Sequence, residues 1–322
     1  MVFAHMSRKL GVFAASCTLA LGLFGGVASA QPWEYEIYPD EDGSMAQIIE
    51  SVSGAETNTK GISYDVDGDD ALEEIRLGYE TDEDGTFNAA LCIDNVDKVE
   101  GLPDGMEESS LKLELLKLPN GCLFIHASGY CNESIDGGLD RLFKVEAVDG
   151  AADPEFAHSV TTVLDCYGNP YIMRGTGVTH ANAGLAYVIG NDIVVGCTSM
   201  TNITGVLTHF VTLECSAAGK LKAYNNPTVA YSFFYNGDGH LTDYSPILRK
   251  VRVYSGVNLN LKKSVTVKKG TQMQIRGVYA KGNTRLLQVQ TKPSGSAKTY
   301  VSGYIKLSNS QLFKYAKIPN AG

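Results

Sequence analysis

Short runs of β-forming residues, separated by turn signals, recur along most of the chain and constrain its fold more than any other feature. In the run 74–79, Ile75, Leu77 and Tyr79 share one face, which is the period of two that a strand requires. Similar runs occur at 87–93, 111–116, 122–127, 142–148, 160–164, 185–189, 206–213 and 229–235. Turn-forming residues separate them, as the Pro-Asn-Gly at 119–121 does. The regular spacing predicts an all-β fold, either a sandwich, a barrel or a propeller.

One helix is expected near the start of this pattern. At 44–52, Met45, Ile48 and Ile49 recur at the spacing that places side chains on one side of a helix. The rest of the pattern is that of strands, so the chain as a whole is expected to be nearly all β.

The first 30 residues have the pattern of a secretory signal peptide. Arg8 and Lys9 precede an apolar stretch at 10–27, and Ala-Ser-Ala at 28–30 supplies the small residues of a cleavage site. Glycines interrupt the stretch and no basic flank follows it, which favours a signal peptide over a transmembrane anchor. No later segment has an apolar run long enough to span a membrane, so we expect a secreted mature chain with no transmembrane segment.

Cysteine usage agrees with export. Of the seven cysteines, Cys17 leaves with the signal peptide, and the even number that remains permits up to three disulfides. Cys122 and Cys131 form the favoured pair, because their separation suits a strand, a loop and a returning strand. Buried free thiols are the alternative. No Cys-x-x-Cys motif is present, so a zinc site is not expected.

The distribution of charge divides the chain in two. All 36 Asp and Glu residues lie between Glu34 and Asp243, and residues 31–243 hold only 10 Lys and Arg. Residues 244–322 hold 15 Lys and Arg and no acidic residue. So abrupt a change predicts a domain boundary near Pro246. The expected parts are a signal peptide at 1–30, a linker with the short helix at 31–59, an acidic propeller-like domain at 60–244 and a basic barrel at 245–322.

An acidic loop at 65–74 is the most specific motif in the sequence. It reads Asp-Val-Asp-Gly-Asp-Asp-Ala-Leu-Glu-Glu, and its alternate carboxylates suit a cation such as Ca²⁺, which binds about six to eight oxygen atoms. A solvated acidic turn is the alternative. An EF-hand is excluded, because its bidentate Glu position is occupied by Arg76 and strand-like residues follow. The predicted ligands are the side chains of Asp65, Asp67, Asp69 and Glu73 and the main-chain carbonyl of Ala71.

The same loop carries a family resemblance. Residues 64–75 resemble the Asp-x-Asp-Gly-Asp-Gly-x-x-Glu signature of FG-GAP/VCBS-type repeats, whose calcium loop joins the strands of a β-propeller blade. The four carboxylates named above stand at its ligand positions, and Gly68 stands at its first glycine. Asp70 replaces the second glycine, and Asp tolerates a left-handed backbone better than most residues. The resemblance implies Ca²⁺ as a cofactor and a propeller-like domain.

The basic C-terminal part resembles a bacterial Src-homology-3-like barrel. Residues 265–271 form the strand and Lys-Gly turn common in that family, and the next strands are expected at 273–278 and 286–289. Gly-Tyr-Ile at 303–305 stands where the family often has Gly-Trp-Ile. Such modules commonly attach exported bacterial proteins to peptidoglycan, so the resemblance implies a cell-wall polymer as partner. The alternative is a barrel that only packs against the acidic domain. Export argues against nucleic acid as a partner.

Catalytic constellations are nearly absent from the sequence. Residues 165–168, Asp-Cys-Tyr-Gly, resemble the Asp-Cys-Ser-Gly nucleophile of cell-wall cysteine peptidases, with His209 as the base. Those enzymes begin a helix at the cysteine, which lowers the pKa of its thiol, whereas Gly-Asn-Pro at 168–170 predicts a turn. We therefore expect a calcium-binding module at the bacterial cell envelope, acting in binding or structure and not as an enzyme. The order of its parts resembles that of exported proteins of Gram-positive bacteria. A cell-wall hydrolase that uses Cys166 and His209 is the alternative.

Overall fold

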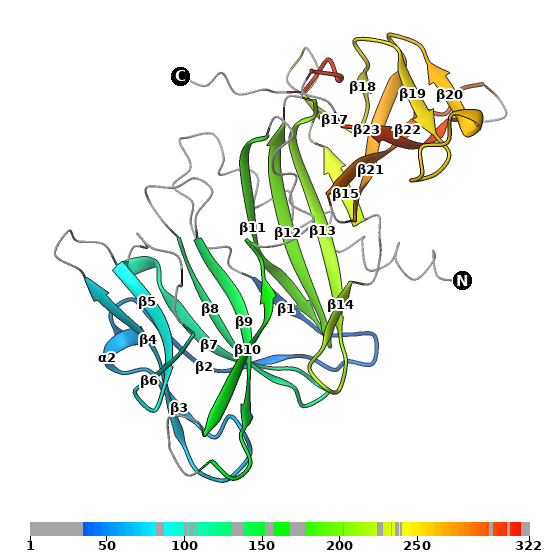
Figure 1. The fold of residues 1–322 in the computed structure, drawn as a ribbon. Helices are drawn as coiled ribbons and strands as arrows, with labels where there is room; N and C mark the ends of the chain where they lie inside the picture. The colour runs from blue at the N-terminus through cyan, green and yellow to red at the C-terminus, as the bar shows by residue number, and fades with distance from the viewer. Residues whose placement is uncertain are drawn as a thin grey trace. The chain divides into compact units, whose positions relative to one another are not determined.

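A computed structural model of the chain describes residues 35–81, 87–99, 102, 106, 108–130, 138–151, 157–167, 178–201, 203–223, 228–232, 234–235, 238, 240–281, 283–295, 299–307 and 310–316. The predicted signal peptide at 1–30 lies outside these residues, and so does Cys131. Nearly all of the regular structure is β, which confirms the all-β prediction (Figure 1). Within the described ranges, no helix has both the length and the apolar character needed to cross a membrane.

A five-stranded antiparallel sheet separates two hydrophobic cores. Its strands are, in order across the sheet, β10 (His158–Asp165), β9 (Gly138–Ala147), β8 (Leu123–Tyr130), β7 (Lys112–Lys117) and β2 (Gln47–Ser53). Side chains alternate between the faces of a strand, so Leu113 and Leu115 of β7 enter one core while Leu116 enters the other. The centre of this sheet is therefore covered on both faces.

A four-stranded sheet covers the first of these faces. Its strands follow one another along the chain as β3 (Ile62–Tyr64), β4 (Glu73–Thr81), β5 (Phe87–Ile93) and β6 (Val96–Val99). Ile62, Ile75 and Leu91 are fully buried in the same core as Leu113 and Leu115. The short helices α2 (Glu56–Thr59) and η2 (Glu108–Ser110) lie in the connections before β3 and before β7.

The other face of the five-stranded sheet packs against part of a 12-stranded sheet. The main path of that sheet runs β1 (Glu36–Tyr38), β11 (Val178–Ile189), β12 (Asp192–Thr201), β13 (Gly205–Cys215), β15 (Thr228–Ser232), β21 (Gln272–Lys281), β22 (Thr284–Thr291), β23 (Ser302–Lys306), β19 (Val251–Tyr254) and β20 (Ser264–Val267). Beside this path, β14 (Leu221–Ala223) pairs with β13, and β18 (Ser245–Pro246) pairs with β21. Leu185 of β11, Val195 of β12 and Val211 of β13 meet Phe124 and Leu142 of the five-stranded sheet.

The C-terminal strands surround a third core. Val253, Met273, Leu287 and Ile305 are buried there. The 3₁₀ helix η4 (Leu261–Lys263) precedes β20, and a separate pair of short strands, β16 (Phe234–Tyr235) and β17 (Leu241–Thr242), precedes this region. Through the pairing of β15 with β21, one sheet contains strands from both sides of the predicted boundary near Pro246.

The finer expectations of a propeller and a barrel are not met among the described strands. A propeller repeats separate four-stranded blades around an axis, and a barrel requires its last strand to pair with its first. Here the sheets are open. The long strands β11 to β13 continue through β15 into β21, and the 12-stranded sheet ends at β20, which pairs with β19.

The helix predicted at 44–52 is wrong. This segment contains β2, whose residues pair in antiparallel register with β7. Met45, Ile48 and Ile49, which the pattern places on one side of a helix, are 50%, 42% and 37% exposed, while Val52 is buried. Hydrogen bonding to the neighbouring strand outweighs the local spacing of apolar residues, because tertiary contacts override a weak helical preference.

Candidate metal centre

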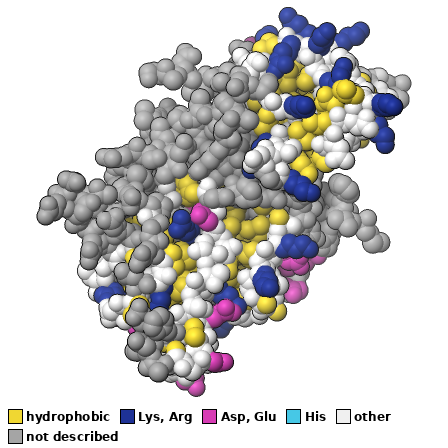
Figure 2. Space-filling model, in the orientation of Figure 1, with side chains coloured by type: hydrophobic (Ala, Val, Ile, Leu, Met, Phe, Trp, Pro, Cys, Tyr) yellow, Lys and Arg dark blue, Asp and Glu magenta, His cyan; other side chains and the backbone are white. Residues whose placement is uncertain are grey.

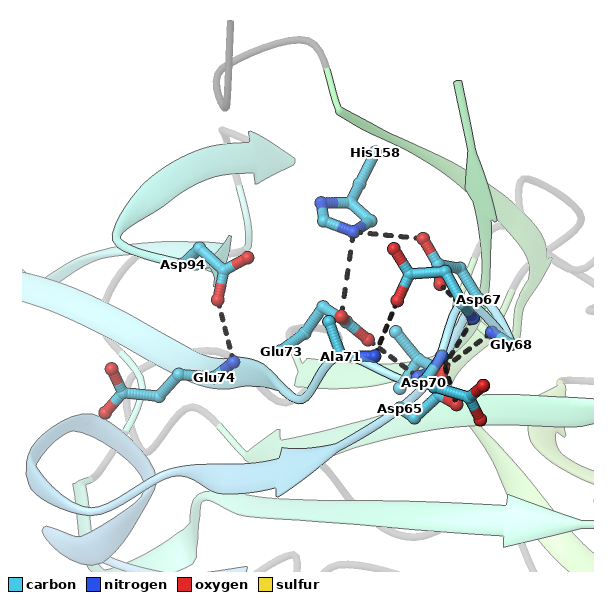
Figure 3. A network of polar contacts seen from close by, with 11 residues as sticks. Asp65, Asp67, Gly68, Asp70, Ala71, Glu73, Glu74, Asp94 and His158 are labelled. Atoms are coloured by element: carbon cyan, nitrogen blue, oxygen red, sulfur yellow. Dashed lines mark hydrogen bonds and ion pairs between the residues drawn. The ribbon is translucent and has the colours of Figure 1, made fainter. Parts of the chain in front are cut away.

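The acidic loop closes the hairpin between β3 and β4. Tyr64 pairs with Glu73 across the hairpin, so the residues between them form the connection (Figure 3). Two of those residues have a left-handed backbone, Gly68 with φ +88° and Asp70 with φ +70°. Asp70 thus occupies the second glycine position of the resembled signature in the conformation expected of that glycine.

Hydrogen bonds to carboxylates give the loop its shape. Asp65 Oδ1 accepts from the N–H of Gly68 over 2.7 Å and from that of Asp69 over 3.2 Å. Asp65 Oδ2 accepts from the N–H of Asp70 over 3.1 Å. Asp69 Oδ1 accepts from the N–H of Ala71 over 2.8 Å. The backbone is therefore wrapped around the carboxylate of Asp65 (Figure 3).

Three of the predicted ligands come together as a group. Asp65, Asp67 and Asp69 each offer a carboxylate oxygen, and these atoms all lie within 4.8 Å of one another. Oxygen atoms bound to one Ca²⁺ at about 2.4 Å are separated by no more than about 5 Å, so this spacing suits a shared ion. Ala71 lies in the same loop and is exposed.

Glu73, the fourth predicted carboxylate, belongs to a second group. This group includes His158, which the sequence pattern does not predict as part of the site. His158, the first residue of β10, places Nε2 3.2 Å from Asp67 Oδ2 and 4.0 Å from Glu73 Oε1. Side-chain atoms of Asp67, Glu73 and His158 lie within 4.8 Å of one another, so Asp67 belongs to both groups. Nothing in the local sequence indicates this contact, because it depends on how β10 lies against the hairpin.

The second group is buried. The side chains of Asp67 and Glu73 are 2% and 3% exposed, and that of His158 is 9% exposed. Burial raises the pKa of Glu73, and the negative charges of Asp67 and Asp65 raise it further. The N–H of Val66, which donates to Glu73 Oε2 over 2.7 Å, and the charge of His158 act in the opposite direction. A buried anion in this position would be stabilised by a cation.

The two groups differ in the ligand atoms that they offer, and therefore in the kind of cation that they suit. Asp65, Asp67 and Asp69 present oxygen alone, which suits a hard ion such as Ca²⁺. His158 adds an imidazole nitrogen, which transition metals accept more readily. A shallow cavity of about 230 Å³ adjoins the loop, lined by residues 64–68 and by Lys117, Gly121 and Leu123.

A second polar cluster lies between the five-stranded and the 12-stranded sheets. His126 Nδ1 is 3.1 Å from Glu114 Oε2, and His126 Nε2 is 3.2 Å from Asp140 Oδ1. Lys112 Nζ is 2.8 Å from Glu114 Oε1, and the N–H of Leu185 donates to Asp140 Oδ2 over 2.9 Å. His126, Glu114 and Asp140 are all buried and come from the neighbouring strands β8, β7 and β9, and the bond from Leu185 of β11 connects this cluster to the 12-stranded sheet.

The residues of the hydrolase alternative lie next to this cluster. Cys166 is fully buried, and its thiol donates to Asp140 Oδ1 over 3.3 Å. Burial and then the charge of Asp140 raise the pKa of this thiol well above its ordinary value. His209 is also fully buried, on β13 opposite Cys197. A catalytic cysteine requires a lowered pKa and access to substrate, so the surroundings of Cys166 do not favour this role.

Comparisons with protein-family models, with curated proteins and with solved structures found no match. The resemblances to FG-GAP/VCBS-type repeats and to Src-homology-3-like barrels therefore remain predictions that rest on the residues of this sequence.

Proposed function

We propose that this protein is an exported β protein that binds one Ca²⁺ in the loop between β3 and β4 and acts as a binding or structural module at the bacterial cell envelope. The observation that carries the proposal is the convergence of Asp65, Asp67 and Asp69 within 4.8 Å. The proposal depends on this loop and on the basic C-terminal residues, and requires neither a propeller nor a barrel.

The ion would have a structural effect beyond the loop. Asp65, Asp67, Asp69, the carbonyl of Ala71 and Glu73 would supply its oxygen ligands. Asp67 and Glu73 also face His158 at the start of β10. An ion held by these carboxylates would therefore tie the four-stranded sheet to the edge strand of the five-stranded sheet, and would offset the repulsion among buried and half-buried anions.

His158 is consistent with this role. Its ring nitrogen faces the carboxylates of Asp67 and Glu73, beside the place where the proposal puts the cation. With Ca²⁺ bound to the oxygen atoms, His158 would orient Asp67 through a hydrogen bond, as outer residues commonly do for metal ligands. His158 is therefore proposed as a positioning residue and not as a ligand.

Thermal melting of the mature chain in Ca²⁺ and in chelator tests the cation site. Binding to the folded state alone stabilises it by about 2.7 kcal/mol at a Ca²⁺ concentration 100 times the Kd, which corresponds to a rise of several degrees. Asp67→Ala should abolish the rise, whereas Asp149→Ala, which changes an exposed turn residue, should preserve it. Equal midpoints of the wild type in Ca²⁺ and in chelator would contradict the proposal.

The envelope part of the proposal depends on the C-terminal charge. Figure 2 shows Lys and Arg side chains gathered over the C-terminal strands, with Asp and Glu side chains visible elsewhere. Without any acidic residue at 244–322, these cations form a surface of one sign, which suits an anionic polymer. The exposed Lys and Arg residues of this surface are Arg249, Lys250, Arg252, Lys262, Lys263, Lys268, Lys269, Arg276, Lys281, Lys292, Lys306 and Lys314.

Sedimentation of the full mature chain with purified Gram-positive cell walls tests this part separately. Retention at low salt should fall steeply by about 0.5 M, because salt screens interactions between exposed charges. A triple variant with Lys262, Lys268 and Lys269 changed to Glu should lose retention. The matched triple variant at Lys60, Lys220 and Lys222, which are exposed on other elements, should keep it. Absence of wild-type retention at low salt would reject wall attachment. It would favour the alternative that the basic C-terminal part only packs against the acidic domain.

A further inference from the structure

Two cysteines from different sheets meet near the turn between β7 and β8. Cys122 directly precedes β8, and Cys215 is the last residue of β13. The thiol of each donates to the carbonyl oxygen of Ser216, over 3.4 Å in both cases. Cys122 Sγ also lies 3.5 Å from the carbonyl oxygen of Ala217. Both sulfur atoms are therefore held around one oxygen atom.

Hydrogen bonds that do not involve sulfur fix the backbone at both cysteines. Asn120 Nδ2 donates to the carbonyl of Cys215 over 3.1 Å, and Asn120 Oδ1 accepts from the N–H of Cys122 over 3.0 Å. Asn191, in the turn between β11 and β12, accepts the N–H of Cys215 on its carbonyl over 3.2 Å and that of Asn120 on its side chain over 2.9 Å. The closeness of the two thiols thus follows from the packing of the turns and not from the sulfur contacts themselves.

The local environment also points to direct interaction between the two thiols. Burial raises the pKa of Cys215 to about 11, and the charge of a Cys122 thiolate contributes to this rise. The Ser216 carbonyl is approached by a third donor, Asn120 Nδ2 at 3.4 Å. A carbonyl oxygen has two lone pairs, so three donors exceed what it can accept well. Loss of the two S–H donors would relieve this competition.

We propose that Cys122 and Cys215 form a disulfide when the folded chain meets a disulfide oxidant, such as oxidised glutathione or an exported protein with a reactive disulfide. Cys122, which is half-buried, attacks the oxidant as a thiolate, forming a mixed disulfide and releasing one thiol. Cys215, which is 5% exposed, then attacks the Cys122 sulfur and releases the second thiol. Two protein thiols are oxidised and one oxidant disulfide is reduced, so electrons and protons balance.

This bond would join the five-stranded sheet to the 12-stranded sheet across a long stretch of chain. It would also replace the pairing of Cys122 with Cys131 that the sequence favours. Of the described cysteines, Cys92, Cys166 and Cys197 are buried. Cys122 is the one described cysteine that is more than slightly exposed, which makes it the entry point for an oxidant.

Peptide mapping of the full mature chain tests the proposal directly. The folded protein is incubated with oxidised glutathione, its remaining thiols are blocked with N-ethylmaleimide, and it is digested with trypsin and chymotrypsin without reductant. Cleavage after Phe124 and Tyr130 separates Cys122 from Cys131. The expected product links peptide 118–124 to peptide 211–220, and it disappears on reduction.

Two single cysteine variants distinguish a Cys122–Cys215 disulfide from a Cys122–Cys131 disulfide. Cys131→Ser should keep the linked product, and Cys215→Ser should lose it and leave Cys122 alkylated or bound to glutathione. Reductant should lower the melting midpoint of the oxidised wild type but not that of Cys215→Ser. Alkylation of both Cys122 and Cys215 in the treated wild type, or a link between Cys122 and Cys131, would overturn the proposal.

Discussion

Replacing His126 with glutamine should destabilise the buried polar cluster that lies between the two large sheets. His126 lies between Glu114 and Asp140, which are 1% and 4% exposed, and a buried carboxylate left without its cation is costly. Removing one partner of a buried ion pair costs about 3–5 kcal/mol. Lys112 stays near Glu114 and the N–H of Leu185 stays with Asp140, which places the expected loss nearer the lower figure.

The loss of unfolding free energy in His126→Gln should depend on pH, because the positive charge of His126 stabilises the folded protein. Burial lowers the pKa of His126, but the hydrogen bonds that it donates to Asp140 and Glu114, together with the negative charges of these carboxylates, outweigh burial and raise the pKa to about 9, from an ordinary value of 6.5. A raised pKa in the folded state gives stability that is fully present below 6.5 and is lost as pH rises through 9. At about 1.4 kcal/mol per pH unit, the wild type should lose about 3 kcal/mol across this window.

Urea unfolding at pH 6, 7.5 and 9.5 measures this effect. The difference in unfolding free energy between wild type and His126→Gln should be largest at pH 6 and should shrink by about 3 kcal/mol at pH 9.5. A wild type and His126→Gln pair with parallel pH profiles would refute the reasoning that His126 is charged in the folded protein.

Three further predictions concern backbone geometry and the metal loop. Gly303→Ala should destabilise the protein by about 2 kcal/mol or more in urea unfolding, because a Cβ there would lie 2.2 Å from the carbonyl oxygen of Tyr254; Gly256→Ala, with open space around it, should be close to neutral. Gly68→Ala should cost about 1 kcal/mol through its φ of +88° alone, since nothing lies within 4 Å of the added methyl group, and an unchanged unfolding midpoint would contradict this. His158→Gln should weaken Ca²⁺ binding by roughly 10-fold in a calorimetric titration without abolishing it; complete loss would make His158 a ligand.

Local patterns in the sequence were sufficient to place many strands. The predicted run 74–79 falls within β4, because Ile75, Leu77 and Tyr79 recur at every second position and leave a period of two, and the β-rich run 87–93 coincides with β5. Predictions failed where a neighbour decides the structure. The segment containing Ile48 and Ile49 has apolar spacing typical of a helix, yet it is a strand because β7 supplies the hydrogen bonds.

In the candidate site, too, the residues of one short segment could be predicted from the sequence, whereas the contacts between distant segments could not. Asp65, Asp67 and Asp69 were identifiable because a cation loop takes its ligands from alternate positions of one short segment. His158 was not, because its contact with Asp67 arises only when β10 packs beside the hairpin. The meeting of Cys122 with Cys215 likewise depends on two sheets coming together and leaves no signal in cysteine spacing.

The most direct test of the central claim is a calorimetric titration of the metal-free mature chain with Ca²⁺, repeated with Zn²⁺ and with Asp67→Ala. The account predicts one Ca²⁺ per chain in the wild type, no binding to Asp67→Ala, and no tighter binding of Zn²⁺ at this loop, because the proposed ligands are all oxygen atoms. Absence of Ca²⁺ binding to the wild type, or tight Zn²⁺ binding that disappears in His158→Gln, would contradict it.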